Sequence, residues 1–326
     1  MKLSFINEDY FPSKVAGGSA KSISLLKRLF DKNNIESEVL TSAIKQKEIN
    51  EDNLYIFNSI FGKTNRRSLL TLLLIRLKKS PRVIIIPRGE LSPGAMSNRI
   101  LLKTLYVLLV VRLINKLLNI QWVATSEEEK TNIINRIGNK TKIEICPNLI
   151  NFDVKIIDST DEVKNLVSIG RIEKKKNQLW LSKLPYQIDL IGPFSPRENG
   201  YKLKVNMAKN LNVLGGRDPE FMNHEYAKYR INLLPTLNEN FGHVVIESIL
   251  HGIPIIISKN TPWTNFINDY NLGFALDLDI DEWAEKIEII LNDIKLYKQN
   301  CIESINELKK LNLEFEHKWL NLIKQL

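Results

Sequence analysis

Short runs rich in isoleucine, valine and leucine alternate with longer helical patterns along almost the whole chain, and this alternation constrains the fold more than any other feature. Runs such as Val83–Ile86 are apolar without interruption, which is typical of strands buried on both faces of a parallel sheet. Helices between such strands cover the two faces of the sheet, so an α/β fold is predicted. The expected strands are Lys2–Ile6, Glu36–Leu40, Leu54–Asn58, Val83–Pro87, Trp122–Thr125, Lys142–Cys146, Leu166–Ile169, Ile188–Ile191, Val213–Leu214, Ile231–Leu234 and Pro254–Ser258.

The chain has 326 residues, which suits two domains of ordinary size. The alternation stops between Pro147 and Glu162, where the sequence is polar and acidic, and then starts again. We therefore expect two doubly wound, Rossmann-like domains, with ligands bound beyond the carboxyl ends of the strands. The predicted boundaries are 1–148 for the N-terminal domain, 149–161 for a linker, 162–300 for the C-terminal domain, and 301–326 for C-terminal helices that can pack back on the N-terminal domain.

Lysine and arginine number 46 against 37 acidic residues, a formal net charge of +9 at pH 7. An excess of this kind favours anionic partners, namely nucleotide phosphates, acidic lipids or nucleic acid. Nucleic acid is not expected, because the loops lack interleaved aromatic residues for base stacking. Two basic, leucine-rich helices are predicted at Asn65–Lys79 and Asn98–Asn119. Each suits either an anionic membrane surface or an ordinary domain helix with its leucines in a core.

The two cysteines, Cys146 and Cys301, lie far apart and have no metal-ligand spacing around them. We expect free, buried thiols and a reducing compartment. The apolar start Met1–Ile6 is too short for a secretory signal, and no uncharged apolar stretch is long enough to cross a bilayer. The predicted location is the cytoplasm, with a peripheral position on the inner face of the membrane as a further option.

The most informative segment follows the predicted strand Ile231–Leu234. A polar loop, Pro235–Phe241, leads there into a helix that starts near Gly242–His243. Amides at the start of a helix attract anionic groups, and two glutamates, Glu239 and Glu247, lie beside them. Their carboxylates can accept hydrogen bonds from sugar hydroxyls. Equally, Glu247 suits a helix surface and Glu239 a solvated loop.

This segment reads Asn238-Glu239-Asn240-Phe241-Gly242, then Glu247, then Gly252-Ile253-Pro254, and it resembles the donor-site motif of glycosyltransferase family 4. Members of that family are retaining enzymes with the GT-B fold, in which two Rossmann-like domains face one another across a cleft. The resemblance implies an acceptor-side N-terminal domain and a C-terminal domain that binds the nucleotide sugar. It also implies that Glu239 contacts the transferred sugar together with the amides of Asn240, Phe241 and Gly242, and that Glu247 binds the ribose.

A second loop, Gly170–Asn177, follows the predicted strand Leu166–Ile169 and contains four cations. It is similar to the Gly-Arg … Lys diphosphate clamp of the family, which implies that Arg171 and Lys176 bind the donor diphosphate. Cleavage of a glycosyl phosphate bond leaves charge on the diphosphate, and paired cations stabilise that charge as it develops. The other two cations, Lys174 and Lys175, are interpreted as solvated loop residues.

Two loops of the N-terminal domain also follow predicted strands. The first contains Gly17 and Gly18, whose missing side chains allow a ligand to approach the backbone. The resemblance places them near the donor phosphate and the acceptor. The second, Pro87–Gly94, carries Arg88 and Glu90, whereas many family members have a histidine near this position. Two interpretations remain open, because Arg88 either binds a phosphate of the acceptor or pairs with Glu90.

The resemblance as a whole implies a metal-independent hexosyltransferase that moves a sugar from a UDP- or GDP-sugar to a glycan or lipid-linked acceptor in cell-surface polysaccharide synthesis. The nucleotide sugar is a co-substrate, so no cofactor is expected. No metal is expected either, since capping of the following helix explains the spacing Asp277-Leu278-Asp279. Two alternatives remain open. One is a nucleotide-sugar epimerase on the same fold, and the other is a non-catalytic nucleotide-sugar-binding or membrane-scaffold protein.

Overall fold

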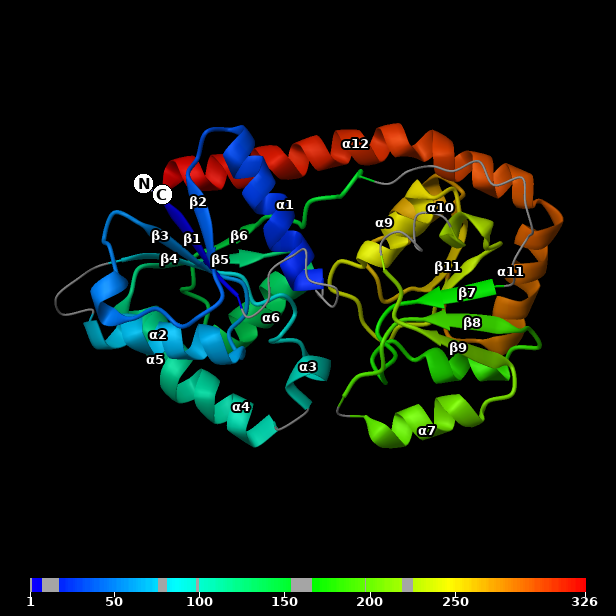
Figure 1. Cartoon of the computed structure of the whole chain (residues 1–326), viewed down its shortest axis with the longest axis horizontal. Helices are drawn as coiled ribbons and strands as arrows, with labels where there is room; N and C mark the ends of the chain where they lie inside the picture. Colours follow the sequence, from blue (N-terminus) through cyan, green and yellow to red (C-terminus); the bar gives the residue numbers. More distant parts are fainter. Residues whose placement is uncertain are drawn as a thin grey trace. The chain divides into compact units, whose positions relative to one another are not determined.

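The computed structural model describes residues 2–7, 18–75, 81–97, 100–153, 166–196, 198–218 and 225–326. The chain divides into two compact units, namely unit 1, Met1–Leu149 with Leu311–Leu326, and unit 2, Ile150–Lys310. Each unit contains one six-stranded sheet, and every strand pairing in both sheets is parallel (Figure 1). The predicted α/β architecture is confirmed. Of the predicted linker 149–161, the part from residue 154 onward lies outside the described residues.

The sheet of unit 1 has the strand order β2-β1-β3-β4-β5-β6. The inner strands β1 and β3 are buried at every position, including the polar Ser4 of β1, whereas the edge strands β2 and β6 contain no buried residue. The burial pattern therefore follows each strand's place in the sheet. The strands are β1 (Leu3–Ile6), β2 (Ser37–Leu40), β3 (Leu54–Phe57), β4 (Arg82–Ile85), β5 (Ile120–Ala124) and β6 (Ile143–Ile145).

Helices cover both faces of this sheet. On one face, buried side chains from α2, α5 and α6 join Phe57 and Trp122 in a single core. Strand residues alternate between faces, so Phe5 points to the opposite face, where it stacks on Phe30 of α1 with ring centroids 6.1 Å apart. The helices are α1 (Gly18–Lys32), α2 (Lys63–Ile75), α3 (Pro93–Ser97), α4 (Ile100–Tyr106), α5 (Arg112–Leu117) and α6 (Glu127–Ile137), with a 3-10 turn η1 (Gln46–Glu48) and a π-helical turn η2 (Val107–Val111).

The last helix, α12 (Ile294–Gln325), contributes its final residues to unit 1. Trp319 is fully buried there, and its Nε1 donates to the carbonyl of Pro147 at 2.8 Å. Arg82 at the start of β4 donates from Nη1 to a terminal oxygen of Leu326 at 2.7 Å. These contacts make the chain's end part of the first unit's structure.

The sheet of unit 2 has the strand order β12-β11-β10-β7-β8-β9. The sequence prediction missed β12, since its run Gly-Phe-Ala-Leu is short and contains no β-branched residue. The strands are β7 (Leu166–Ile169), β8 (Ile188–Ile191), β9 (Leu211–Gly215), β10 (Asn232–Leu234), β11 (Ile255–Ser258) and β12 (Gly273–Leu276). The helices are η3 (Gln178–Lys183, a 3-10 helix), α7 (Asn199–Met207), η4 (Tyr226–Lys228, a 3-10 helix), α9 (His243–Leu250), α10 (Thr264–Asp269), α11 (Ile280–Asn292) and the first part of α12.

Within the described residues, no helix is both long and apolar enough to span a membrane. Cys146 and Cys301 are buried and free, as predicted.

Candidate functional site

The two loops singled out in the C-terminal half meet at one edge of the sheet of unit 2. They follow β7 and β10, which are parallel neighbours, so the carboxyl ends of both strands lie at the same edge. Backbone contacts tie the loops together. The carbonyl of Lys175 accepts a hydrogen bond from the Leu237 amide at 2.9 Å and another from the Thr236 hydroxyl at 3.2 Å. The sheet therefore brings together loops that are far apart in the sequence.

An ion pair joins the same two loops through side chains. Lys176 Nζ contacts Glu239 Oε2, and the two side chains are only 16% and 11% exposed. The Glu239 backbone is held independently, because its amide donates to the carbonyl of Asn260 at 3.1 Å. A lysine ammonium has three donors, so Lys176 can hold Glu239 and a further anion at once. Both residues were predicted from the sequence as site residues, and the structure places them in contact.

Gly242 is required for the close approach of this loop to the start of α9. Its φ is 77°, in the left-handed region, and a Cβ there would lie 3.0 Å from Glu239 Cγ. The preceding Phe241 is only 6% exposed, and its ring packs edge-on against Trp263 with centroids 5.3 Å apart. Trp263 also donates from Nε1 to the carbonyl of Phe241. The Phe241 ring therefore fixes the loop against Trp263.

Arg171 lies in a different environment from Lys176. Its side chain is 54% exposed, and Nη1 lies 3.9 Å from Glu173 Oε2. The structure thus brings Lys176 to Glu239 and leaves Arg171 beside Glu173. Glu247 is a half-buried residue of α9 in the second turn after the loop, and its carbonyl accepts from the His251 amide at 3.2 Å.

Gln178 supports this loop, and sequence reasoning missed it. Its Nε2 donates to the carbonyl of Arg171 at 2.9 Å, and its Oε1 accepts from the Glu173 amide at 3.3 Å. The side chain is buried, so these bonds replace those that water would otherwise supply. A lone glutamine at the start of a short helix gives no signal in the sequence, because the same residue is common on helix surfaces.

In unit 1, Arg88 has an unusual conformation and unsatisfied donors. Its φ is 55°, and Nε donates to Asn58 Oδ1 at 2.7 Å. The buried Nη1 and Nη2 have no hydrogen-bond partner among the described residues. Burial lowers the pKa of the Arg88 guanidinium to about 10, although the Glu129 carboxylate acts in the opposite direction. The side chain is still charged at neutral pH.

Glu90 and Arg88 form no ion pair within the described part of the chain. The Glu90 carboxylate instead accepts hydrogen bonds from the Ser59 hydroxyl at 2.7 Å and from the Ile60 and Phe61 amides at 2.6 and 3.2 Å. Burial raises the pKa of Glu90, and these hydrogen bonds oppose the shift. The carboxylate thus holds the turn that follows β3.

Glu129 is a second buried carboxylate beside Arg88. The sequence predicts a capping box in which Ser126 and Glu129 bond to one another's amides. The first half is confirmed, because Ser126 Oγ accepts from the Glu129 amide at 3.2 Å. The second half is wrong, since the Glu129 carboxylate accepts from the amides of Gly89 and Thr125 and from the Thr125 hydroxyl. The carboxylate therefore bonds to Thr125, just before the helix, and to Gly89 in the Arg88 loop rather than to the Ser126 amide.

The remaining predicted residues of the N-terminal half are the two glycines. Gly17 lies outside the described residues. Gly18 is the exposed first residue of α1, and its carbonyl accepts from the Ser22 hydroxyl at 2.9 Å.

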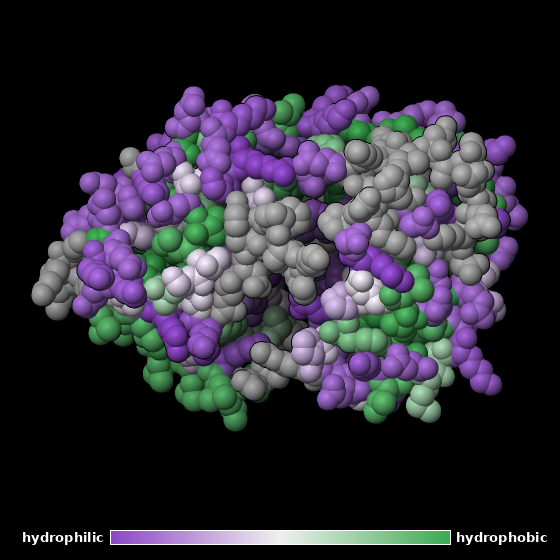
Figure 2. All heavy atoms as spheres, viewed as in Figure 1, coloured by the Kyte–Doolittle hydropathy of each residue, from purple (hydrophilic) through white to green (hydrophobic). Residues whose placement is uncertain are grey.

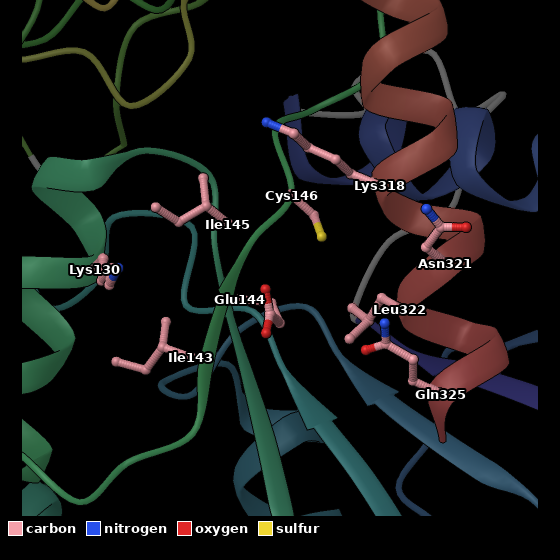
Figure 3. A pocket seen from close by; sticks show the side chains of 9 residues that line it. All are labelled: Lys130, Ile143, Glu144, Ile145, Cys146, Lys318, Asn321, Leu322 and Gln325. Atoms are coloured by element: carbon pink, nitrogen blue, oxygen red, sulfur yellow. The ribbon is translucent and has the colours of Figure 1, made fainter.

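A cavity of about 350 Å³ lies in unit 1 between β6 and α12 (Figure 3). Glu144 and Cys146 line one side, and Lys318 and Asn321 of α12 line the other. Burial raises the pKa of the Cys146 thiol to about 12, so the thiol is protonated at neutral pH and is a poor nucleophile. None of the predicted site residues lines this cavity.

Among the described residues, no group of three histidine, cysteine or acidic side chains is placed to hold a metal ion. Asp279 caps α11, because its side chain accepts from the Glu282 amide at 2.9 Å. The predicted capping role of this aspartate is confirmed.

The comparisons with known proteins agree with this geometry. Residues 151–306 match the family model described as glycosyl transferases group 1. A search of the curated proteins found no match. Solved structures similar to this chain include Anabaena Alr3699/HepE in complex with UDP and glucose (TM-score 0.70, 16% identity, 100% of both chains covered). They also include sucrose-phosphate synthase from Thermosynechococcus elongatus (TM-score 0.74, 15% identity, 100% of both chains covered) and WaaG, a glycosyltransferase involved in lipopolysaccharide biosynthesis (TM-score 0.67, 15% identity, 96% of this chain and 98% of that chain covered).

The structural matches extend over both units, whereas the family match covers almost the whole of unit 2, including Lys176, Glu239 and Glu247. The chain therefore has the GT-B fold, and its residues 151–306 match the model of the glycosyl transferases group 1 family.

Proposed function

We propose that the chain is a retaining glycosyltransferase that transfers a hexose, without a metal ion, from a nucleoside diphosphate sugar to a glycan or lipid-linked acceptor in cell-surface polysaccharide synthesis. The observation that carries the proposal is the Lys176–Glu239 ion pair, formed where two strands of the family-matched unit end. Two of the similar structures support the chemistry, since one holds UDP and glucose and another acts in lipopolysaccharide biosynthesis.

In the proposed donor site, different residues bind the diphosphate, the ribose and the sugar of the donor. Lys176 and Arg171 bind the diphosphate, and Glu247 binds the ribose. Glu239 binds the sugar together with the amides of Asn240, Phe241 and Gly242. Gly17 and Gly18 are further proposed contacts of the donor phosphate. In the transfer, the bond from the anomeric carbon to the diphosphate oxygen breaks and the acceptor oxygen bonds to that carbon. The acceptor proton then goes to the leaving phosphate.

The ion pair fits this role because part of each side chain, 16% for Lys176 and 11% for Glu239, stays exposed to solvent. Glu239 holds the Lys176 ammonium at the strand ends and offsets its charge while no diphosphate is bound. When the diphosphate arrives, the ammonium can contact it without losing Glu239, since three N–H groups are present. A donor group that is positioned in advance stabilises the developing charge without reorganising.

On the acceptor side, we propose that Arg88 binds an anionic group of the acceptor, such as the phosphate of a lipid carrier. Its buried Nη1 and Nη2 lack partners in the described part of the chain, and unsatisfied buried donors are costly. A non-glycine residue at positive φ is a strained conformation of the kind that clusters at functional sites. Glu90 then acts as a positioning residue, because its carboxylate holds the neighbouring turn after β3.

A lipid-linked acceptor remains at a membrane, and the sugar nucleotides that serve as donors are cytoplasmic. We therefore propose that the enzyme works in the cytoplasm and binds peripherally to the inner face of the membrane.

The first experiment is thermal unfolding of the purified protein with UDP, GDP, ADP and their common sugar conjugates. A ligand at a hundred times its dissociation constant adds roughly 2.7 kcal/mol of stability. We expect one nucleotide to stabilise the wild type, and Glu247→Ala to abolish the effect. If no nucleotide stabilises the folded protein, the donor site is wrong.

Turnover in a matched pair of variants tests the clamp. Lys176→Ala is expected to lower turnover roughly a hundredfold, the scale seen when one donor to a developing oxyanion is removed. Lys174→Ala removes the same charge from an exposed position of the same loop and is expected to leave turnover unchanged.

Arg88→Lys tests the acceptor site, and this variant is expected to raise KM for the acceptor while nucleotide stabilisation persists. Equal turnover in Lys176→Ala and the wild type would contradict the clamp, and isomerised donor without acceptor would instead indicate an epimerase.

A further inference from the structure

Unit 1 carries a continuous set of exposed leucines on α2 and on the run from α4 through η2 to α5. Leu101, Leu109 and Leu74 keep 77%, 67% and 74% of their surface exposed. Because α2 packs against α5, the two segments are neighbours. Figure 2 shows hydrophobic atoms gathered at the lower left, over these helices. We call this surface the leucine face, and it consists of Leu70, Leu74, Ile100, Leu101, Leu102, Leu105, Leu108, Leu109 and Leu113.

The helix that carries most of the leucine face is apolar on both of its sides. Its inner side, represented by Val107, Val111 and Ile114, is buried in the core of unit 1. Its outer side presents Leu101, Leu105 and Leu109 at intervals of four residues, which lie on one face of a helix. An exposed apolar surface of this kind marks an interaction site.

The charge of the chain is concentrated in the same region. From Asn53 to Ser126 the sequence contains 12 lysines and arginines and a single acidic residue, Glu90. The whole chain has a net charge of +9, so this segment carries +11 and the remainder −2. Glu90 is turned inward onto backbone amides and does not offset the surface charge. The exposed cations beside the leucine face are Lys63, Arg66 and Arg67 on α2 and Arg112 and Lys116 on α5.

We propose that the leucine face docks unit 1 on an anionic lipid bilayer. The leucines enter the boundary between head groups and acyl chains, and the flanking arginines and lysines contact lipid phosphates. This inference deepens the membrane location proposed above, but it depends on no residue of the donor site.

The charge distribution distinguishes this partner from two others. A second copy of the chain docked face to face would bring two strongly cationic surfaces together, which is unfavourable. A nucleic acid would use the cations but not the leucines, since its binding to a protein groove depends on phosphate contacts and on aromatic stacking. An anionic bilayer satisfies both the apolar and the cationic part of the surface.

The test is co-sedimentation of the full chain with phosphatidylcholine vesicles, with and without phosphatidylglycerol. We expect binding to the anionic vesicles, weaker binding to the neutral ones, and a decrease with salt, because exposed charges are screened. The triple variant Leu101→Gln, Leu105→Gln, Leu109→Gln is expected to lower the partition coefficient at least tenfold. Arg66→Gln and Arg67→Gln are each expected to lower it about fivefold, the equivalent of about 1 kcal/mol per cation.

A matched control replaces three exposed leucines outside the leucine face, namely Leu203→Gln, Leu296→Gln and Leu313→Gln. This variant is expected to bind vesicles like the wild type. Failure of the wild type to bind anionic vesicles overturns the proposal, as does equal loss in the control or a triple variant that still binds. Stabilisation by nucleotide is measured in the same proteins, so a lost donor site and a lost membrane surface give different results. A change of oligomeric state in the triple variant, without vesicle binding by the wild type, assigns the leucine face to self-association instead.

Discussion

The Lys176–Glu239 ion pair allows a prediction about stability that needs no substrate. The perturbation is a pair of variants that preserve side-chain length, Lys176→Met and Glu239→Gln, and their combination. Removing one partner of a buried pair leaves an uncompensated charge and costs roughly 3–5 kcal/mol, whereas an exposed pair contributes about 0–1 kcal/mol. The side chains here are 16% and 11% exposed, which places the pair near the buried limit. We therefore expect each single variant to lose about 2–3 kcal/mol.

The double variant carries no charge at either position, so it should be more stable than the sum of the single losses predicts. When both residues of one ion pair are substituted, the change in unfolding free energy commonly differs from the sum of the single changes by about 0.5–3 kcal/mol. A domain of this size shifts its Tm by about 2–4 °C per kcal/mol, so each single variant should melt about 4–12 °C below the wild type. Thermal unfolding without nucleotide, followed by tryptophan fluorescence, measures all four proteins.

Lys174→Met is the control, because Lys174 is an exposed cation of the same loop. Its Tm is expected to match that of the wild type. Single variants as stable as the wild type would show that the two side chains do not pair in solution. A double variant as unstable as the sum of the single losses would show that they act independently. Either result would remove the contact on which the proposed donor site depends.

Two further predictions concern the supporting structure. Gly192→Ala is expected to lower the free energy of unfolding by at least about 3 kcal/mol, as measured by urea denaturation. A Cβ at Gly192 would lie 1.9 Å from the carbonyl oxygen of Gly170, at the base of the Lys176 loop, and the φ of Gly192 is 152°. An unchanged denaturation midpoint would contradict the packing of Gly192 against Gly170. Burial raises the pKa of the Cys146 thiol to about 12, and burial also raises the pKa of the Cys301 thiol. Both thiols are therefore expected to resist iodoacetamide at pH 8 in the native protein and to react once the protein is unfolded, as measured by mass spectrometry. Rapid labelling of the native protein would show that the thiols are accessible.

The sequence by itself determined the local structure well. The strands β7 and β8 begin and end where the sequence predicts, because each is a short, mostly apolar run with polar segments around it. The loops after β7 and β10 were also evident, since each strand ends in a polar segment that leads into a helix. Failures came where local signals were weak, as in β12, whose four residues are Gly-Phe-Ala-Leu.

Contacts between distant segments were decided by the tertiary structure alone. Lys176 and Glu239 are 63 residues apart, and they meet because β7 and β10 are neighbours in the sheet, an order that no local pattern specifies. Glu129 provides a second case. Its spacing from Ser126 predicts a bond within the helix, but the carboxylate reaches the Gly89 amide of the Arg88 loop. A polar side chain bonds to whichever donor the packed fold brings to it.

The exposure of the leucine face is a third property that the sequence could not predict. The pattern of leucines in 98–119 fits both a buried helix and an interfacial one, and the sequence alone allows either. Hydrophobic periodicity reports which residues share a side of the helix, whereas exposure depends on what packs against that side. The core of unit 1 takes Val107, Val111 and Ile114 and leaves Leu101, Leu105 and Leu109 outside, and only the assembled fold could decide between them.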